Sequence, residues 1–335
     1  MKKVSLEDIS KELGVSKTLI SFVMNGRAKE MRVSEAMAEK ILNKANEMGY
    51  RPHHMARALR TGKSFTLGLI VADISNPFFA KLARSIENEA ARFDYHVIFG
   101  SSDEQAEKSQ KMCEVFLEKK VDGLLICPSS GDLSLVRRLK NSKIPFVLID
   151  RYFEEEASNV VIVDNEEGSF QLLDSMIRQG HRKIGYIGFK FDLINASLRL
   201  KGYRRALSSN GLNYQEELVI EVPYEGIEKG TKEAVRQMLL SQPDLDAIFF
   251  GNNHLAFLGL EEVLRHNKNN QKKVAMGSFD GLDLMKHVPM KISYGKQPIE
   301  KIGRSAVSLM MKQLNSETPL DEKNKIPLTI NHTQE

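Results

Sequence analysis

From Phe65 onward, short apolar runs alternate with helical segments over about 270 residues. Most of these runs contain few polar positions, which is typical of strands buried on both faces of a parallel sheet. The alternation predicts doubly wound parallel sheets, and its length predicts two of them. Ligands of such sheets bind beyond the carboxyl ends of the strands. The expected strands are residues 66–72, 95–100, 121–127, 144–150, 160–164, 183–189, 218–222, 246–251, 272–278, 291–294 and 326–331.

The residues before Phe65 differ in charge from the rest of the chain. Residues 1–64 contain 13 lysines and arginines against 7 aspartates and glutamates, whereas the whole chain of 335 residues has a net charge of only +4. The remainder is therefore slightly acidic. A small basic segment attached to a larger acidic body is typical of a module that binds a polyanion such as nucleic acid. A solvated charged surface is the alternative that charge alone leaves open.

The basic segment contains three short helical patterns with clear stops. Ser5 caps a pattern over residues 5–13, Ser16 caps a second that ends near residues 25–26, and a third covers residues 34–48. A tight turn with a glycine joins the first two, which predicts a helix-turn-helix. The residues expected to face inward are Leu6, Ile9, Leu13, Leu19, Ile20, Val23, Met37, Ile41, Ala45 and Met48.

A fourth segment, residues 52–60, has good helix formers, but Met55 and Leu59 have no obvious core face on which to pack. A helix of this length is marginal in water on its own. We therefore expect it to form only with a partner, and we expect residues 61–64 to be a linker.

Missing signals exclude several classes of protein. Two cysteines, Cys113 and Cys127, cannot build a disulfide framework, so a reducing cytoplasm fits best. The N-terminal residues lack the apolar stretch of a secretory signal, and no apolar run approaches the roughly 18 residues of a membrane span. These features predict a cytoplasmic protein that is neither exported nor bound to a membrane.

The motifs of common α/β enzymes are also missing. The sequence contains no G-x-G pair, no G-x-x-x-x-G-K-[ST] loop, no G-x-S-x-G elbow and no H-E-x-x-H. We interpret His53 and His54 as exposed polar residues, and the two cysteines as buried apolar side chains rather than nucleophiles. The sequence therefore predicts no enzyme activity, no metal site and no cofactor.

A set of short motifs runs along nearly the whole chain. In the first part they are Gly14-Val15-Ser16, Ser21, Val23, Asn25-Gly26, Val33-Ser34, Gly49-Tyr50-Arg51-Pro52, Ala56-Arg57-Ala58-Leu59-Arg60-Thr61-Gly62 and Asp73-Ile74-Ser75-Asn76-Pro77-Phe78-Phe79. Further along they are Asp150-Arg151, Asp164-Asn165, Gly180-His181, Arg199, Gly202-Tyr203, Phe279-Asp280 and Gln297-Pro298. Each motif is weak alone, but their order and spacing together resemble the lactose-repressor/galactose-repressor (LacI/GalR) family of bacterial transcription regulators.

The resemblance implies an all-α helix-turn-helix DNA-binding domain in residues 1–50, a hinge helix and linker in residues 51–64, and an effector-binding core in residues 65–335. The core would be α/β, with two lobes of doubly wound parallel sheet like a type I periplasmic binding protein. The implied lobes are residues 65–150 with 296–320, and residues 152–292 with 322–332, with chain crossings near residues 150, 292 and 320.

In the family, the second helix of the head reads bases in the major groove with its first turns. Lys17 would donate a hydrogen bond to a guanine base, or alternatively contact only a phosphate. Ser16 would contact the DNA, or alternatively serve only as the cap of its helix. Phe22 would contact a thymine methyl group or pack inward. Leu19 and Phe22 replace the family's usual Thr and Arg, and the loop at residues 27–32 is about three residues longer than usual. The implied DNA-binding residues of the head are Ser16, Lys17, Thr18, Ser21, Phe22 and Asn25.

In the hinge, Leu59 matches the leucine with which the family wedges open a base step in the minor groove, and Ala56 would allow close approach. A packing role for Leu59 is the alternative. Arg60 completes the implied DNA-binding set.

The resemblance places an effector between the lobes. Carboxylates, an amide and a guanidinium beside an aromatic wall suit a polyhydroxylated ligand, because each hydroxyl both donates and accepts, and this favours a sugar or sugar phosphate. The two phenylalanines are alternatively core aromatics, and Asp150 alternatively caps a helix or loop. Asn253 is at a position where the family usually has Asp, and Ser197 is at a position where some members have Arg. An anionic group of a ligand would therefore be bound less well here. The implied effector-binding residues are Phe78, Phe79, Asp150, Arg199, Asn252 and Asp280.

These features together predict a ligand-responsive, sequence-specific repressor that binds a palindromic DNA operator as a homodimer, in the cytoplasm and at the nucleoid of a bacterium. A dimer is expected rather than a tetramer, because no heptad tail follows residue 332. A sugar-binding protein with the same core would need a signal peptide in place of the basic segment, and an α/β enzyme would need the missing motifs.

Overall fold

The computed structural model describes residues 4–24, 26–50, 62–190, 193–281, 285, 287–316, 318 and 320–333. The chain divides into two compact units, Met1–Ser64 and Phe65–Glu335, which we call the head and the body. The division coincides with the change of sequence pattern at Phe65.

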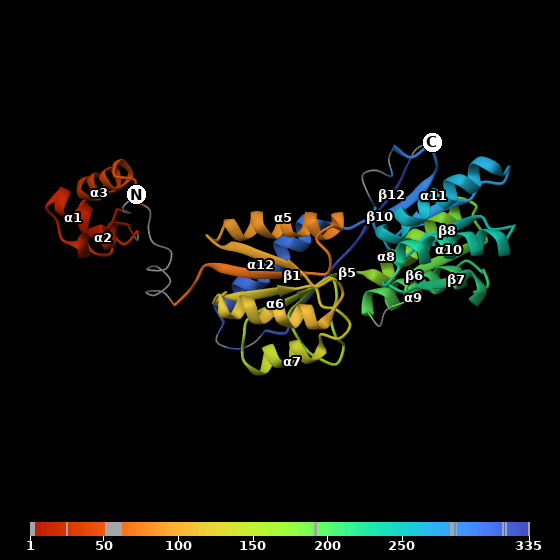
Figure 1. Ribbon diagram of the computed structural model, residues 1–335, viewed down its shortest axis with the longest axis horizontal. Coiled ribbons are helices and arrows are strands. Elements are labelled where there is room, and N and C mark those ends of the chain that lie inside the picture. The colour runs from red at the N-terminus through yellow and green to blue at the C-terminus, as the bar shows by residue number, and fades with distance from the viewer. Residues whose placement is uncertain are drawn as a thin grey trace. The chain divides into compact units, whose positions relative to one another are not determined.

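Three helices make up the described part of the head, α1 (Leu6–Leu13), α2 (Lys17–Met24) and α3 (Glu35–Glu47) (Figure 1). Ser5 begins α1 with a capping box, and Gly14 ends it in the left-handed region, with a φ of 65°. The helices pack around Ile9, Ile20, Val23, Ile41 and Ala45, and the other predicted inward-facing residues are partly buried against this cluster. The three predicted helices are confirmed.

The body contains two six-stranded sheets. Sheet A has β1 (Thr66–Val71), β2 (His96–Ser101), β3 (Gly123–Ile126), β4 (Phe146–Ile149), β5 (Val160–Val163) and β11 (Lys323–Ile326), in the order β11-β5-β4-β3-β1-β2. Sheet B has β6 (Ile184–Phe189), β7 (Val219–Val222), β8 (Ala247–Phe250), β9 (Ala275–Ser278), β10 (Ile292–Lys296) and β12 (Thr329–His332), in the order β12-β10-β9-β8-β6-β7. Among the strand pairs of the described residues, only β10 with β12 is antiparallel.

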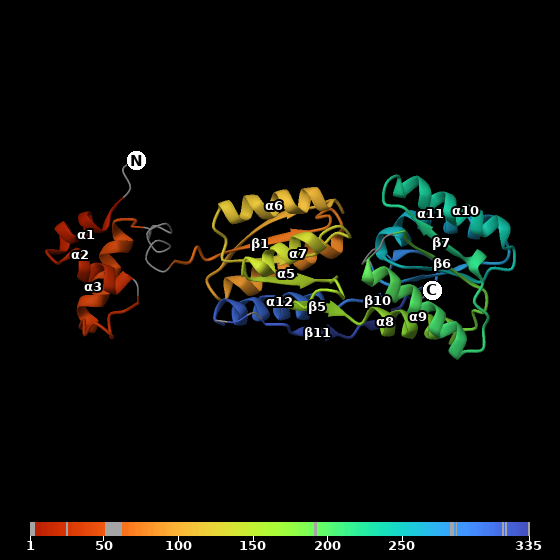
Figure 2. The ribbon, with the colours of Figure 1, turned by 90° about the horizontal axis from the view of Figure 1, so that it is seen from below.

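Sheet A is covered on both faces, because successive side chains of a strand point to opposite sides. Leu69 lies in one buried cluster with residues of α5 (Pro77–Ala91) and α12 (Ile299–Leu314). Its neighbour Ile70 lies in another cluster, with residues of α6 (Ala106–Glu118) and α7 (Leu133–Asn141). Sheet A and these four helices form the first lobe (Figure 2).

Sheet B repeats this arrangement. Phe249 packs with residues of α8 (Asn165–Arg178) and α9 (Ile194–Ser209), and its neighbour Phe250 packs with residues of α10 (Ile227–Ser241) and α11 (Asn253–Asn269). A single 3-10 turn, η1 (Glu216–Leu218), precedes β7. Sheet B and these helices form the second lobe, and the predicted class of two doubly wound sheets is confirmed.

The strand pairings correct the predicted lobe boundaries. β5 pairs with β4, and β11 pairs with β5, so both belong to the first lobe. The chain therefore crosses between lobes after Val163, after Lys296 and after Ile326, rather than near residues 150, 292 and 320. An apolar run such as β5 shows that a strand is buried, but it does not show which of two similar sheets the strand joins.

The strand predicted over residues 326–331 is in fact two strands in different sheets, β11 and β12. Pro327 lies between them. Proline has no N–H to give to a strand ladder, so the chain leaves sheet A here and enters sheet B two residues later.

Candidate ligand cleft and DNA-facing helix

A cavity of about 60 Å³ lies at the carboxyl ends of strands from both lobes. All six predicted effector-binding residues line it. Its polar lining residues are Asp73, Asn76, Glu104, Asp150, Arg151, Tyr186, Asn195, Arg199, Tyr224, Asn252, Asn253, His254, Asp280 and Gln297. We call this place the cleft.

Two helices begin at the cleft, and an asparagine caps each of them. Asn76 accepts a hydrogen bond from the backbone N–H of Phe78 at 3.0 Å and starts α5, in which Pro77 occupies the first turn. Asn252 accepts one from the N–H of Leu255 at 2.9 Å and starts α11. An N-cap side chain satisfies an amide that has no partner inside the helix. The predicted site residue Asn252 is therefore also a structural cap.

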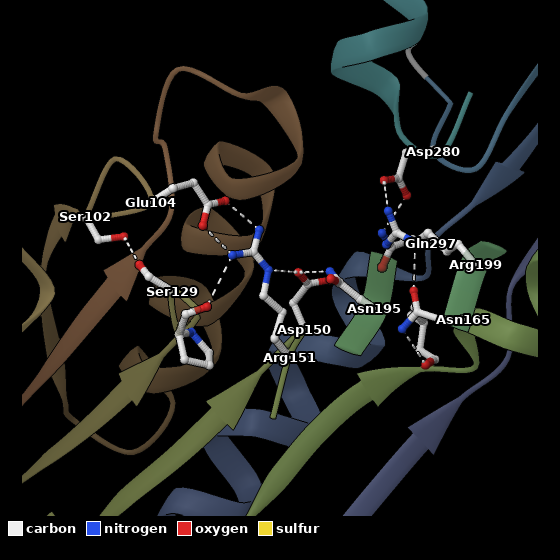
Figure 3. A network of polar contacts seen from close by, with 12 residues as sticks. Ser102, Glu104, Ser129, Asp150, Arg151, Asn165, Asn195, Arg199, Asp280 and Gln297 are labelled. Atoms are coloured by element: carbon white, nitrogen blue, oxygen red, sulfur yellow. Dashed lines mark hydrogen bonds and ion pairs between the residues drawn. The ribbon is translucent and has the colours of Figure 1, made fainter. Parts of the chain in front are cut away.

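The second-lobe side of the cleft is organised by Arg199, whose side chain is almost fully buried. Its Nε donates to Asn165 at 2.8 Å, its Nη1 donates to the carbonyl of Gly251 at 2.8 Å, and Nη1 lies 3.8 Å from an oxygen of Asp280 (Figure 3). The guanidinium also stacks 3.8 Å above the ring of Phe279. These contacts hold the guanidinium in one orientation.

Asp280 sits beside this guanidinium and accepts a hydrogen bond from Nε2 of Gln297, which lies on the segment that crosses between the lobes (Figure 3). Burial raises the pKa of the Asp280 carboxyl, while the charge of Arg199 and the hydrogen bond from Gln297 oppose the rise. Gln297 was not among the predicted site residues, although it belongs to one of the family motifs.

The first-lobe side is organised by a buried ion pair. Arg151 forms two hydrogen bonds with the carboxylate of Glu104, at 2.6 and 2.7 Å, and a third with the carbonyl of Pro128 at 3.2 Å (Figure 3). Asp103 and Glu104 have φ values of 51° and 57°, so two consecutive residues lie in the left-handed region to present this carboxylate. Sequence reasoning missed Glu104, because no motif links a loop after β2 to an arginine after β4.

Two asparagines of the second lobe reach across to the first. Asn195 donates to Asp150 at 3.1 Å, and Asn253 donates to Asn76 at 3.1 Å. Figure 3 shows the first of these contacts. Asp150 therefore accepts a hydrogen bond across the cleft. Neither Asn195 nor Asn76 was predicted as a site residue.

Phe78 and Phe79 serve both purposes that the sequence left open. Their rings pack edge to face with centroids 5.0 Å apart, and both belong to the buried cluster of the first lobe. Both also line the cleft. They are core aromatics that provide its apolar wall.

In the head, the predicted DNA-facing residues Ser16, Lys17 and Thr18 are exposed at the start of α2. The hydroxyl of Ser16 accepts from the N–H of Leu19 at 3.1 Å, so Ser16 caps α2. Nζ of Lys17 lies 2.6 Å from the carboxylate of Glu7 in α1. The remaining predicted residues Asn25, Ala56, Leu59 and Arg60 lie outside the described residues.

Ser21 and Phe22 are half-buried in α2. Phe22 is not a member of the head's apolar cluster, and the guanidinium of Arg27 lies 5.7 Å from its ring centroid. The phenylalanine therefore does not pack into the centre of the head, which leaves its ring beside a cation at the helix surface.

Within the residues that the structure describes, no group of three His, Cys, Asp or Glu side chains is placed to hold a metal ion. None of the described helices is both long and apolar enough to cross a membrane.

Comparison with known proteins gives consistent matches. The family model for periplasmic binding proteins and the sugar binding domain of the LacI family matches residues 64–334. Catabolite control protein A of Priestia megaterium is 31% identical over 335 residues, which covers 99% of this chain and 98% of that protein.

Two solved structures share the fold over nearly the whole chain. The lac repressor dimer bound to operator and the anti-inducer ONPF has a TM-score of 0.82 at 18% identity, and the complex of the transcriptional regulator CelR with cellobiose has 0.71 at 24% identity; each covers 98% of both chains. The curated relatives are transcriptional regulators, not enzymes. The chain is a member of the LacI family of transcriptional regulators.

Proposed function

We propose that this protein is a repressor that binds a palindromic DNA operator as a homodimer and changes its operator affinity when a sugar or sugar phosphate enters the cleft. The observation that carries the proposal is the convergence of Arg199, Asp280, Asp150 and Asn252 on one cavity between two sheets. The match of residues 64–334 to a family of sugar binding domains supports the choice of ligand.

The cleft also supports a link between ligand binding and lobe movement. Ligand pockets usually measure roughly 300 to 1,000 Å³, so the cavity of about 60 Å³ must widen to hold a sugar. Widening requires the hydrogen bonds Asn195–Asp150 and Asn253–Asn76 between the lobes to break or rearrange. A ligand that prefers one arrangement of the lobes shifts their equilibrium. Coupling to DNA of roughly 1 to 3 kcal/mol would follow.

The dimer is supported by the lac repressor, which shares this fold and is a dimer bound to operator. A two-fold dimer presents two copies of α2, which suits a palindrome of about 14 to 20 base pairs. Ala56, Leu59 and Arg60 would then contact the minor groove between the half-sites.

The first test is a thermal-shift screen of sugars and sugar phosphates on the whole protein, followed by calorimetry of the strongest ligand with the variant Asp280→Ala. We expect the variant to lose roughly 1.5 to 3 kcal/mol of ligand affinity, because a charged partner leaves a buried polar network. Asp244→Ala is the matched control, since Asp244 is an exposed carboxylate paired with Lys183 outside the cleft. Equal affinity of both variants and the wild type would contradict the assignment of the cleft.

The second test concerns base reading by α2. We expect Lys17→Ala to weaken binding to operator DNA by about 1 to 3 kcal/mol more than it weakens binding to random DNA. Lys11→Ala is the control, because Lys11 is also exposed and also pairs with Glu7, at 3.6 Å, but lies on α1. Fluorescence anisotropy over a range of salt concentrations measures both. If Lys17→Ala weakens both DNAs equally and only reduces the salt slope, the lysine contacts a phosphate and does not read bases.

A further inference from the structure

The charges around the cleft are unequal. Among the described lining residues, four carboxylates, Asp73, Glu104, Asp150 and Asp280, face two guanidiniums, Arg151 and Arg199. The lining therefore has a formal charge of −2. If Asp280 is counted as neutral, three carboxylates still outnumber the two cations. Burial lowers the pKa of the lining histidine, His254, against the opposing charge of Asp73, so this ring does not add a cation at neutral pH.

Both guanidiniums are already neutralised within the protein. Glu104 occupies two donors of Arg151 in a bidentate pair, and Nε of Arg151, which makes no hydrogen bond to the described residues, lies 3.3 Å from a carboxylate oxygen of Asp150. Arg199 donates to an amide and a carbonyl and lies 3.8 Å from Asp280. A phosphate that approached either arginine would have to compete with a carboxylate that is buried beside it.

A buried acceptor adds a second, independent observation. Oε1 of Gln297 has no hydrogen-bond partner in the described structure, and the residue is 6% exposed where it lines the cleft. Its Nε2 donates to the Asp280 carboxylate, which fixes the orientation of the amide. A buried acceptor without a partner favours a ligand that brings a donor, such as a hydroxyl group, and disfavours an anionic oxygen.

The helix ends do not reverse this balance. The amino-terminal ends of α5 and α11 favour negative charge, but in each of them the capping asparagine already accepts from one free amide, that of Phe78 in α5 and that of Leu255 in α11. The helix ends therefore attract an anion less than uncapped ends would, while the carboxylates that repel it lie directly in the lining.

We infer that the cleft selects an uncharged polyhydroxylated ligand, a sugar without a phosphate group, and rejects the phosphorylated form of the same sugar. The inference rests on the proposed function, because it takes the cleft as the effector site. A phosphomonoester carries a charge of about −1.5 to −2 at neutral pH, which this lining would repel. Hydroxyl groups can instead donate to Gln297 and the carboxylates and accept from the asparagine amides.

The experiment uses the full chain and two kinds of probe. The first kind is matched pairs measured by calorimetry: glucose with glucose 6-phosphate, fructose with fructose 1-phosphate, and ribose with ribose 5-phosphate. We expect the neutral member of any pair that binds to bind at least about tenfold more tightly. A sugar phosphate that binds more tightly than its neutral partner would overturn the inference.

The second probe is inorganic phosphate at constant ionic strength, compared between the wild type and the variants Glu104→Gln and Asp280→Asn. Each variant removes one carboxylate that pairs with an arginine of the cleft, which leaves that arginine open to phosphate. We therefore expect phosphate to raise the melting temperature of each variant more than it raises that of the wild type. Phosphate bound by the basic head raises the melting temperature of all the proteins equally, so it cancels in the comparison. The control variant Asp244→Asn should respond to phosphate as the wild type does. An equal phosphate response in wild type and both variants would also overturn the inference.

The two arms separate the possible failures. If no sugar or sugar phosphate binds, the proposed effector class is wrong, but the phosphate arm still decides whether the cleft excludes anions. If Glu104→Gln does not fold, Asp280→Asn gives the same comparison at the other arginine.

Discussion

Replacing Arg199 by alanine is expected to lower the free energy of unfolding of the body by about 3 to 5 kcal/mol. The change leaves the Asn165 amide oxygen and the Gly251 carbonyl without their donor, and it leaves the buried Asp280 without its nearest cation. Breaking a buried pair by removing one partner is far more damaging than removing an exposed charge. Urea denaturation followed by circular dichroism measures the effect.

Three comparisons make this result specific. Arg204→Ala removes an exposed arginine from the same helix and should change stability by less than about 1 kcal/mol. The double variant Arg199→Ala/Asp280→Asn should recover part of the loss, because no buried carboxylate is left unpaired. The deficit of Arg199→Ala should also shrink on acidification, since a protonated Asp280 no longer needs a cation. If Arg199→Ala unfolds at the same urea concentration as Arg204→Ala, the network does not stabilise the body.

The second large effect is expected from Gly202→Ala. A Cβ at this position of α9 would lie 2.7 Å from Cβ of Ser169 and 2.9 Å from the backbone N of Phe170, and it would also clash with the carbonyl of Glu166. These atoms belong to α8, and two of the contacts are with backbone, so no side-chain rotation relieves them. We expect a loss of about 3 kcal/mol. The melting temperature should fall by roughly 6 to 12 °C.

Gly202→Ala should also weaken ligand binding. The hydroxyl of Ser169 donates to the carbonyl of Arg199 at 2.7 Å, so moving α9 away from α8 moves the arginine that organises the cleft. Ser208→Ala, at an exposed position of the same helix, should leave both melting temperature and affinity unchanged. A normal melting temperature for Gly202→Ala would show that the two helices can separate without loss.

The sequence predicts local structure here better than it predicts which parts meet. The head helices follow from capping serines, terminal glycines and apolar spacing, all of which act within a few residues. The apolar runs likewise predict nearly every strand. The assignment of β5 and β11 to the first lobe depends on pairing with distant strands, and two sheets with similar apolar runs do not differ in any local signal.

The same distinction applies to the cleft. Five of its six predicted residues belong to the family motifs, Asn252 is a position that the resemblance implies, and all six line one cavity. Three residues of the cleft were not predicted, because each acts through a hydrogen bond to a partner far away in the chain. The separations are 47 positions for Glu104, 45 for Asn195 and 177 for Asn76. The unusual backbone at Glu104 gives no sequence signal either, since neither Asp103 nor Glu104 is a glycine.

The interleaving of the two lobes has a consequence for how this fold can change during evolution. The second lobe is largely an insertion within the first, and the short C-terminal stretch supplies one edge strand to each sheet, β11 and then β12. Neither lobe corresponds to one continuous piece of gene. A recombination break anywhere between β5 and β12 divides a sheet, so the two lobes are inherited together, whereas the head ends before Phe65 and can be exchanged as a single segment.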